Sequence, residues 1–306
     1  NLYILYGINT LNKLIFSYSQ FQEAYMKKLS VLIAIIFLVT CFLGKTYYDS
    51  KIKADVQGAQ HKEETEKQEE ENSLKKQISK VKNDASNQIS DDAKKEFNLV
   101  PFQTKAFKKL ENGQAATIVF LGDSTTEQNS QTNGKPGHVS IINDLLKNTF
   151  GSGIINVINS GVSGNTIVDM SNRIENVINA NPDLVIINSG LNDVGKKVSN
   201  DVFEEKYKSI IEQIQSKTKA QIILRTSNVT KDDWVNKRLE KEINPIVQRL
   251  AADYKTGFVD LYSYYNYQVK NSNMELNSIN NDNIHPNEKG QQIISDLMLY
   301  SLMGEN

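Results

Sequence analysis

The 306-residue sequence contains few of the residues that bind metals or cross-link chains. It has a single cysteine, Cys41, so an internal disulfide is impossible. Its three histidines, His61, His138 and His285, lie far apart and form no short-spaced cluster with cysteine. Zinc sites use several such ligands at short spacing. We therefore expect no metal and no cofactor, and any catalysis would use side chains alone.

The sequence also has almost no net charge. Its 35 lysines and arginines are balanced by 36 acidic residues, which gives a formal net charge of −1. Nucleic-acid binding needs an excess of basic residues to neutralise phosphates, so we expect no nucleic-acid partner. Hydrophobic residues make up 39% of the chain, which is enough to bury a sizeable core.

Only one stretch is apolar and uncharged over a length close to that of a membrane. Residues 29–44 follow Lys27-Lys28 directly, which is the layout of a bacterial export signal. No A-x-A cleavage pattern follows, so residues 26–48 are expected to be an uncleaved signal anchor. The protein would then cross the bacterial cell membrane once, with its C-terminal part outside the cytoplasm. Residues 38–41 also resemble a lipoprotein signal, which leaves lipidation of Cys41 open.

The segments on either side of this run lack the pattern of a folded domain. Residues 1–25 precede Met26, which begins a well-formed signal, so they are either an upstream sequence translated by mistake or a short cytoplasmic tail. Residues 49–99 are rich in Lys, Glu, Gln, Asp and Asn and bury too little apolar surface to offset the entropy of ordering. We expect a charged linker there, with a short helix or coiled coil left open by the apolar spacing of residues 74–81.

Residues 100–306 alternate between strand-like and helix-like patterns. Five short apolar, β-branched runs predict strands at 115–121, 154–158, 184–187, 221–224 and 256–261. Helical patterns cover 139–148, 169–180, 202–216, 234–254 and 286–302. This alternation predicts an α/β domain whose five-stranded parallel sheet is covered on both faces. Ligands in such folds bind beyond the carboxyl ends of the strands, so chemistry is expected there.

Four polar clusters lie at such positions. Residues 122–124, 159–166 and 190–193 follow the first three predicted strands, and residues 282–286 precede the last helix. Each cluster alone is equally explained as a turn or a helix cap. Together they supply a serine nucleophile, a histidine base, a carboxylate that orients the base, and donors for an oxyanion. That set is what acyl transfer to serine requires.

The spacing within the clusters suits these roles. Asp282 stands three residues before His285, so one loop can bring its carboxylate to the imidazole and fix the tautomer. Asn192 offers a side-chain amide at a strand end. Gly161 and Gly164 permit close approach of the backbone to a ligand.

The clusters VFLGDSTT, NSGVSGNT, SGLND and DNIHPNEKG resemble blocks one, two, three and five of the GDSL/SGNH hydrolase superfamily, in particular its lysophospholipase-like and acyl-esterase branch. The resemblance covers residues 115–302 and implies a flavodoxin-like three-layer α/β/α sandwich. It implies that Ser124 is the nucleophile, with Asp282 and His285 completing the triad. It also implies an oxyanion hole made by the Ser124 and Gly164 N–H groups and the Asn192 amide, with Gly161 as an alternative to Gly164.

We therefore expect a membrane-tethered extracytoplasmic serine esterase that hydrolyses short acyl esters, acetyl in particular, on a carbohydrate. Block one reads GDSTTEQ rather than the longer lipase form, which disfavours long-chain lipase activity. The alternatives are an O-acyltransferase acting on a cell-envelope glycan beside a membrane acyl-transfer partner, a lysophospholipase or thioesterase, and a non-catalytic envelope-binding module.

Three further features leave two interpretations each. His138 lies either at the mouth of the site or on the surface. The tyrosines at 262, 264, 265 and 267 either stack on a sugar or pack under the final loop. Arg225 either meets an anionic group or forms a structural ion pair.

Overall fold

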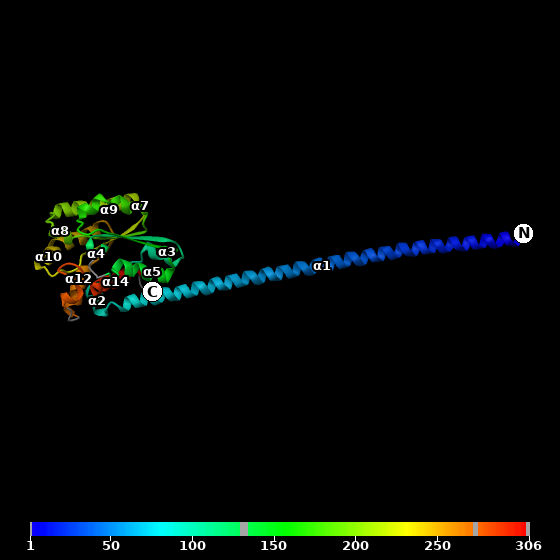
Figure 1. Ribbon diagram of the computed structural model, residues 1–306, viewed down its shortest axis with the longest axis horizontal. Helices are drawn as coiled ribbons and strands as arrows, with labels where there is room; N and C mark the ends of the chain where they lie inside the picture. Colours follow the sequence, from blue (N-terminus) through cyan, green and yellow to red (C-terminus); the bar gives the residue numbers. More distant parts are fainter. Residues whose placement is uncertain (1, 129–133, 272–274, 304–306) are drawn as a thin grey trace. The chain divides into compact units, whose positions relative to one another are not determined.

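The computed structural model describes residues 2–128, 134–271 and 275–303, which divide into two units, Asn1–Glu71 and Asn72–Asn306 (Figure 1). The first unit is helical. Its helix, α1, begins at Leu2 and ends at Asn87, so the last turns of α1 belong to the second unit. All side chains described between residues 6 and 71 are exposed. One stretch of α1 is long and apolar enough to cross a membrane, a property that a signal sequence near the N-terminus shares.

The second unit begins earlier in the chain than the domain boundary expected at residue 100. Its first part contributes to the hydrophobic core, although the composition of residues 49–99 predicts a charged linker. The buried apolar side chains of this part are Ile78, Ala85, Ile89 and Ala93. Polar and charged residues separate these positions and mask the apolar pattern, because each helical segment packs inward by only one narrow face. The Lys82 ammonium also pairs with the Glu111 carboxylate at 2.8 Å.

The centre of the second unit is a five-stranded sheet in which all neighbouring strands run parallel. The five strands predicted from the apolar runs are all confirmed, with small shifts at their ends. Their order in the sheet is β2-β1-β3-β4-β5. The strands are β1 (Ala116–Gly122), β2 (Ile155–Gly161), β3 (Leu184–Asn188), β4 (Gln221–Arg225) and β5 (Gly257–Val259).

Helices cover both faces of this sheet, as the predicted three-layer sandwich requires. Figure 1 shows α7 and α9 on one side of the sheet and α5, α12 and α14 on the other. The helices after α1 are α2 (Asp91–Glu96), α3 (Lys105–Glu111), α4 (Ser124–Glu127), α5 (His138–Phe150), α6 (Ile167–Asn172), α7 (Ile174–Asn179), α8 (Leu191–Gly195), α9 (Asn200–Lys217), α10 (Asp233–Arg238), α11 (Asn244–Asp253), α12 (Leu261–Asn271), α13 (Leu276–Ile279) and α14 (Glu288–Met303).

Two of the predicted helices are interrupted. The helix expected over residues 169–180 is divided into α6 and α7. The helix expected over residues 234–254 contains a π-helical turn, Leu239–Ile243, between α10 and α11. Pro245 stands at the start of α11, where its missing N–H and fixed φ disturb the regular hydrogen-bond ladder.

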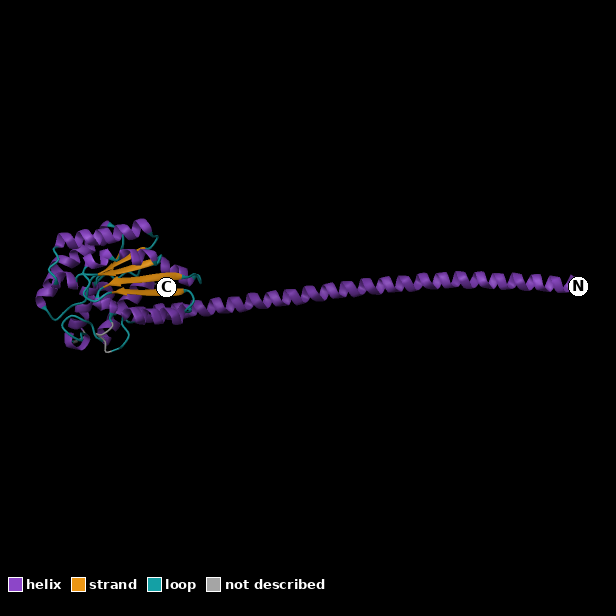
Figure 2. Cartoon of the chain, turned by 45° about the horizontal axis from the view of Figure 1, so that its top comes forward, coloured by secondary structure: helices purple, strands orange, loops and turns teal. Residues whose placement is uncertain are grey.

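The strand direction places all the polar strand ends at one edge of the sheet. The arrowheads in Figure 2 point the same way, and every residue of β3 is buried between the two helical layers. Gly122 at the end of β1 pairs with Gly161 at the end of β2, and Asn188 at the end of β3 pairs with Arg225 at the end of β4. The loops that leave these four ends therefore begin side by side.

Candidate active site

Ser124 lies at the start of a short helix that follows β1 after one residue, Asp123. Asp123 caps this helix, α4, and its carboxylate accepts hydrogen bonds from the Thr125 N–H and hydroxyl, both at 2.9 Å. A side chain at Gly122 would place its Cβ 2.1 Å from the Thr126 hydroxyl, so the turn requires glycine. As the first residue of α4, Ser124 has no intrahelical acceptor for its own N–H. Its side chain is largely buried, with 7% of the residue exposed.

A chain of hydrogen bonds joins Ser124 to the loop before α14. The Ser124 Oγ lies 2.9 Å from His285 Nε2, and His285 Nδ1 lies 2.7 Å from Asp282 Oδ2. The other Asp282 oxygen accepts the backbone N–H groups of Ile284 at 2.8 Å and His285 at 2.7 Å. Burial opposes ionisation of Asp282, but the hydrogen bonds from His285 and Ile284 outweigh it and hold its pKa below the usual value. The structure thus brings together the three residues that the sequence predicts to act together.

The loop after β2 carries Gly164 and contacts Asn192 on α8. Gly164 has a φ of +76°, which glycine adopts without strain. The Asn192 amide donates to the Asn165 carbonyl oxygen at 3.1 Å, which leaves its second N–H available. The Gly164 N–H has no acceptor within the part of the chain that the structure describes.

Gly161, the alternative to Gly164, has a different environment. Its N–H donates to the Asn159 side chain at 2.9 Å, so this donor is occupied. A Cβ at Gly161 would lie 2.2 Å from the Glu127 backbone nitrogen, so the residue serves close packing between β2 and α4. Of the two glycines, Gly164 is therefore the one with a free donor.

Arg173 holds the loop after β2 against the sheet. The sequence patterns did not identify this residue. Its guanidinium donates to the Asn165 side chain at 2.8 Å, the Ser160 hydroxyl at 2.8 Å and the Gly122 carbonyl at 2.9 Å. One side chain thus ties the end of β1 to the end of β2 and to the loop. A fork of donors in fixed geometry is the property that distinguishes arginine from lysine.

The segment after β4 supports the loop that carries His285, and the sequence patterns did not identify this support either. The Asn228 amide donates to the Ile284 carbonyl at 2.8 Å, and the Lys231 N–H donates to the Asn283 carbonyl at 2.7 Å. The available signal was the polar run TSNVT at residues 226–230, because it follows a strand end just as the other clusters do.

A buried polar cluster lies beneath Ser124. Arg225 is only 1% exposed, and burial lowers its pKa to about 10, while the charge of Asp123 acts in the opposite direction. Burial likewise raises the pKa of Asp123. Neither interpretation of Arg225 is confirmed: the side chain is inside the domain, and no ion pair within 4 Å joins it to a described acidic residue, although Asp123 is its main opposing charge.

His138 and the tyrosines also belong to the interior. His138 is fully buried against Gln291, with its Nδ1 2.6 Å from the amide oxygen, and burial lowers its pKa to about 3. Both interpretations of His138, mouth or surface, are therefore wrong. Tyr262, Tyr264 and Tyr265 are buried, and the Tyr265 hydroxyl donates to the Ile279 carbonyl at 3.0 Å. Packing under the final loop is thus the correct interpretation for Tyr265. The Tyr262 hydroxyl instead donates to the Asn236 carbonyl at 3.3 Å, and the Tyr264 ring packs edge-on against Phe97.

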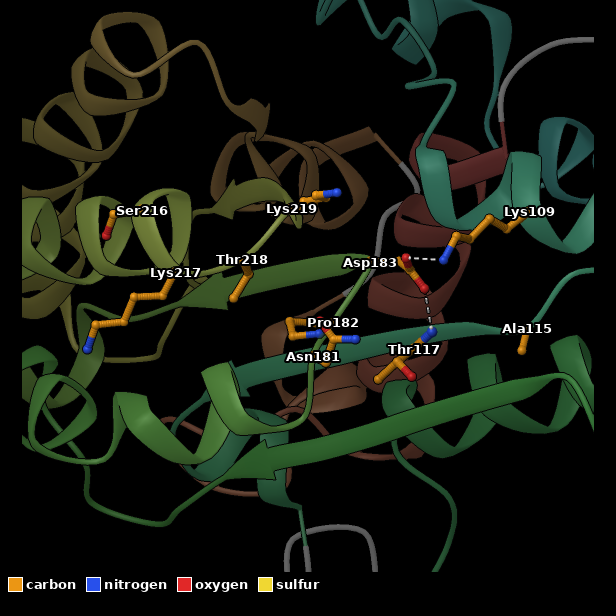
Figure 3. A pocket seen from close by; sticks show the side chains of 10 residues that line it. All are labelled: Lys109, Ala115, Thr117, Asn181, Pro182, Asp183, Ser216, Lys217, Thr218 and Lys219. Atoms are coloured by element: carbon orange, nitrogen blue, oxygen red, sulfur yellow. Dashed lines mark hydrogen bonds and ion pairs between the residues drawn. The ribbon is translucent and has the colours of Figure 1, made fainter.

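A cleft of about 700 Å³ lies away from this site, at the amino ends of the strands (Figure 3). Its lining includes Asp183, which accepts hydrogen bonds from the Lys109 ammonium at 2.6 Å and the Thr117 N–H at 3.0 Å. These bonds connect α3 and β1 to the turn before β3. The charged groups at the centre of the cleft are thus committed to one another, which indicates a structural role.

Comparisons with known proteins identify the family and the fold of this domain. A sequence model of the GDSL-like Lipase/Acylhydrolase family matches residues 120–293. An acetylxylan esterase of Geobacillus stearothermophilus is 27% identical over 207 residues, which are 61% of this chain and 94% of that protein. The crystal structure of that organism's acetylxylan esterase Axe2 superposes with a TM-score of 0.55, at 24% identity over 63% of this chain and 96% of the other. LAE5, an α/β hydrolase from the metagenome of Lake Arreo, Spain, gives a TM-score of 0.54 at 23% identity, over 61% of this chain and 95% of that chain.

Proposed function

Because the chain belongs to the GDSL-like lipase/acylhydrolase family, and is thus a serine ester hydrolase of the SGNH type, we propose that it removes short acyl groups, acetyl in particular, from carbohydrates. In this proposal Ser124 is the nucleophile, and His285 and Asp282 complete the triad.

The observation that carries the proposal is the hydrogen-bond chain from Ser124 to Asp282. With the Asp282 carboxylate 2.7 Å from Nδ1, the imidazole keeps its proton on Nδ1 and presents Nε2 as an acceptor. Nε2 lies 2.9 Å from the Ser124 Oγ, within reach of the hydroxyl proton. The lowered pKa of Asp282 keeps its carboxylate charged, so that it stabilises the imidazolium that forms during the reaction.

The reaction then follows in two halves. The Ser124 Oγ attacks the ester carbonyl carbon while its proton moves to His285 Nε2. The carbon–oxygen bond to the sugar breaks, and the sugar oxygen leaves with that proton, so the acyl group remains on Ser124. A water molecule attacks the acyl carbon next and gives its proton to Nε2. The bond to Oγ breaks, Oγ takes the proton back, and the carboxylic acid leaves.

Three donors support the negative oxygen of each tetrahedral intermediate in this proposal. They are the Ser124 N–H, the Gly164 N–H and the Asn192 amide. The first two groups have no acceptor within the described residues, and Asn192 retains one N–H after its bond to Asn165. Fixed donors of this kind act most strongly where charge develops in the transition state.

The substrate class rests on two lines of support. The relative from Geobacillus stearothermophilus is an acetylxylan esterase, and this chain matches 94% of its length. The GDSTTEQ sequence after β1 also lacks the longer lipase form. We infer an acetylated carbohydrate as the substrate.

The cellular location in this proposal follows from α1. The charge-free residues 29–44 come directly after Lys27-Lys28, and their side chains are exposed, as a lipid-facing helix requires. We infer that these residues hold the enzyme on the bacterial cell membrane, with the hydrolase domain on the extracytoplasmic side. Protease protection of the domain in intact cells, but not in lysed cells, would reject that orientation.

The function itself is tested with the full chain in detergent. Hydrolysis of p-nitrophenyl acetate, butyrate and octanoate is measured beside acetate release from acetylated xylan. We expect the acetate ester to have the highest kcat/KM and the glycan to lose acetate without an added acceptor. A preference for octanoate would contradict the substrate class. Rapid transfer to an added glycan, with little hydrolysis, would identify an acyltransferase instead.

A further inference from the structure

We propose that Lys196 positions the Gly164 donor of the oxyanion hole. This inference rests on the proposed function, because it assigns a purpose to the loop that carries Gly164. Lys196 lies directly after α8, and its ammonium donates to the Gly164 carbonyl oxygen at 2.7 Å. Lys196 does not reach the reacting atoms in this proposal, so its effect on catalysis is indirect.

The N–H of Gly164 belongs to the peptide unit between residues 163 and 164. The peptide unit before it is held at its N–H end, because the Ser163 N–H donates to the Glu127 carboxylate at 2.6 Å. The peptide unit after it is held at its carbonyl end by Lys196. The unit that carries the free donor is therefore fixed from both sides by charged side chains, one of each sign.

The two residues that bond to the carbonyl oxygens of this loop come from α8 and from the residue that follows it. Asn192 and Lys196 stand four residues apart, so they project from the same face of α8. They reach consecutive carbonyl oxygens, Lys196 that of Gly164 and Asn192 that of Asn165. A shift of α8 would thus move the Asn192 amide and the Gly164 N–H together, so two of the three donors would keep their positions relative to each other.

A lysine at position 196 is useful because residue 164, which it contacts, is a glycine. Gly164 has a φ of +76°, and no atom beyond its two chain neighbours lies within 4 Å of the place where a Cβ would be, so it has little packing of its own to fix its orientation. A charge-assisted hydrogen bond is stronger than a neutral one and replaces that missing packing. The Lys196 side chain is 57% exposed, so water screens its charge and the hydrogen bond supplies most of the effect.

The test uses the full chain in detergent with Lys196→Met, Lys196→Arg and a control, Lys206→Met, which changes a partly exposed lysine on α9 whose ammonium pairs with Glu205 at 3.0 Å. Lys196→Met should lower kcat for p-nitrophenyl acetate by about 10-fold, less than the roughly 10²–10³ for outright loss of a donor. KM should change by less than about 3-fold, since the donors act mainly on the transition state. Lys196→Arg should recover most of the activity, and the control should match wild type.

A second readout separates positioning from a general structural role. A boronic acid that forms a tetrahedral adduct with the serine places an oxygen in the hole, so its Ki should rise by the same factor by which kcat falls. An unchanged kcat and Ki in Lys196→Met would overturn the proposal. A fall in kcat that is accompanied by a lower melting temperature, with neither restored in Lys196→Arg, would also overturn the proposal. Activity that survives Ser124→Ala would instead remove the proposed function itself.

Discussion

Replacement of Asp282 by asparagine should strongly lower kcat, because of the hydrogen bonds that the two Asp282 oxygens make. Asp282 Oδ1 accepts two backbone N–H groups, from Ile284 and His285, while Oδ2 faces His285 Nδ1. In Asp282→Asn the amide carbonyl must take the Oδ1 position, because only an acceptor satisfies the two N–H groups. The amide NH₂ then faces Nδ1. A donor at that place selects the tautomer with its proton on Nε2, which cannot accept the proton of Ser124.

The expected size of this effect follows from the same reasoning. Loss of the correct tautomer in a Ser-His-Asp triad lowers kcat by about 10⁴, which is roughly 5.5 kcal/mol in activation free energy. The stability should change little, because both backbone N–H groups keep their acceptor and the Asp282 side chain is half exposed. The loss should therefore appear in kcat and not in the melting temperature.

The assay compares the variant with wild type and with Asp201→Asn, an exposed aspartate in the first turn of α9. Hydrolysis of p-nitrophenyl acetate gives kcat, and circular dichroism gives the melting temperature. A kcat within about tenfold of wild type, at an unchanged melting temperature, would refute the reasoning about the tautomer.

Three further predictions concern the oxyanion hole, the pH dependence and the domain boundary. Asn192→Ala should lower kcat by roughly 10²–10³ with a small change in KM, as steady-state kinetics will show; an unchanged kcat would leave Asn192 as a turn residue. Asp282, whose pKa is below its ordinary 3.8, should stay ionised across the acid range of the assay, so the acid limb of log(kcat/KM) should have a slope of one; a slope of two would contradict this. A fragment that begins at Asn72 should fold and hydrolyse acetate esters, and one that begins at Val100 should melt at a lower temperature, because it lacks core residues; equal melting temperatures would reject the earlier boundary.

The sequence predicted the sheet well because its strands are short, continuous apolar runs. β3 is buried along its whole length, so its residues LVIIN show no polar alternation that could hide them. The polar clusters at the strand ends were equally visible, since parallel strands bring their carboxyl ends to one edge. The juxtaposition of Ser124 with His285, 161 residues later, follows from that topology.

Other features depend on contacts that no local pattern encodes. His138 is buried because Gln291, 153 residues away, supplies its hydrogen-bond partner. The Lys196 bond to Gly164 joins two loops, and a lysine in a loop has no distinctive spacing. The helical turns before residue 100 contribute only a few apolar side chains, which are separated by polar and charged residues, so composition alone predicts a linker.

The central claim is that Ser124 is the nucleophile, and a fluorophosphonate tests it most directly. The reagent forms a covalent bond with an activated serine Oγ and releases fluoride, so mass spectrometry of digested protein locates the adduct. We predict one adduct, on the peptide that contains Ser124. Ser124→Ala should give no adduct under the same conditions. Equal labelling of wild type and Ser124→Ala would contradict the account.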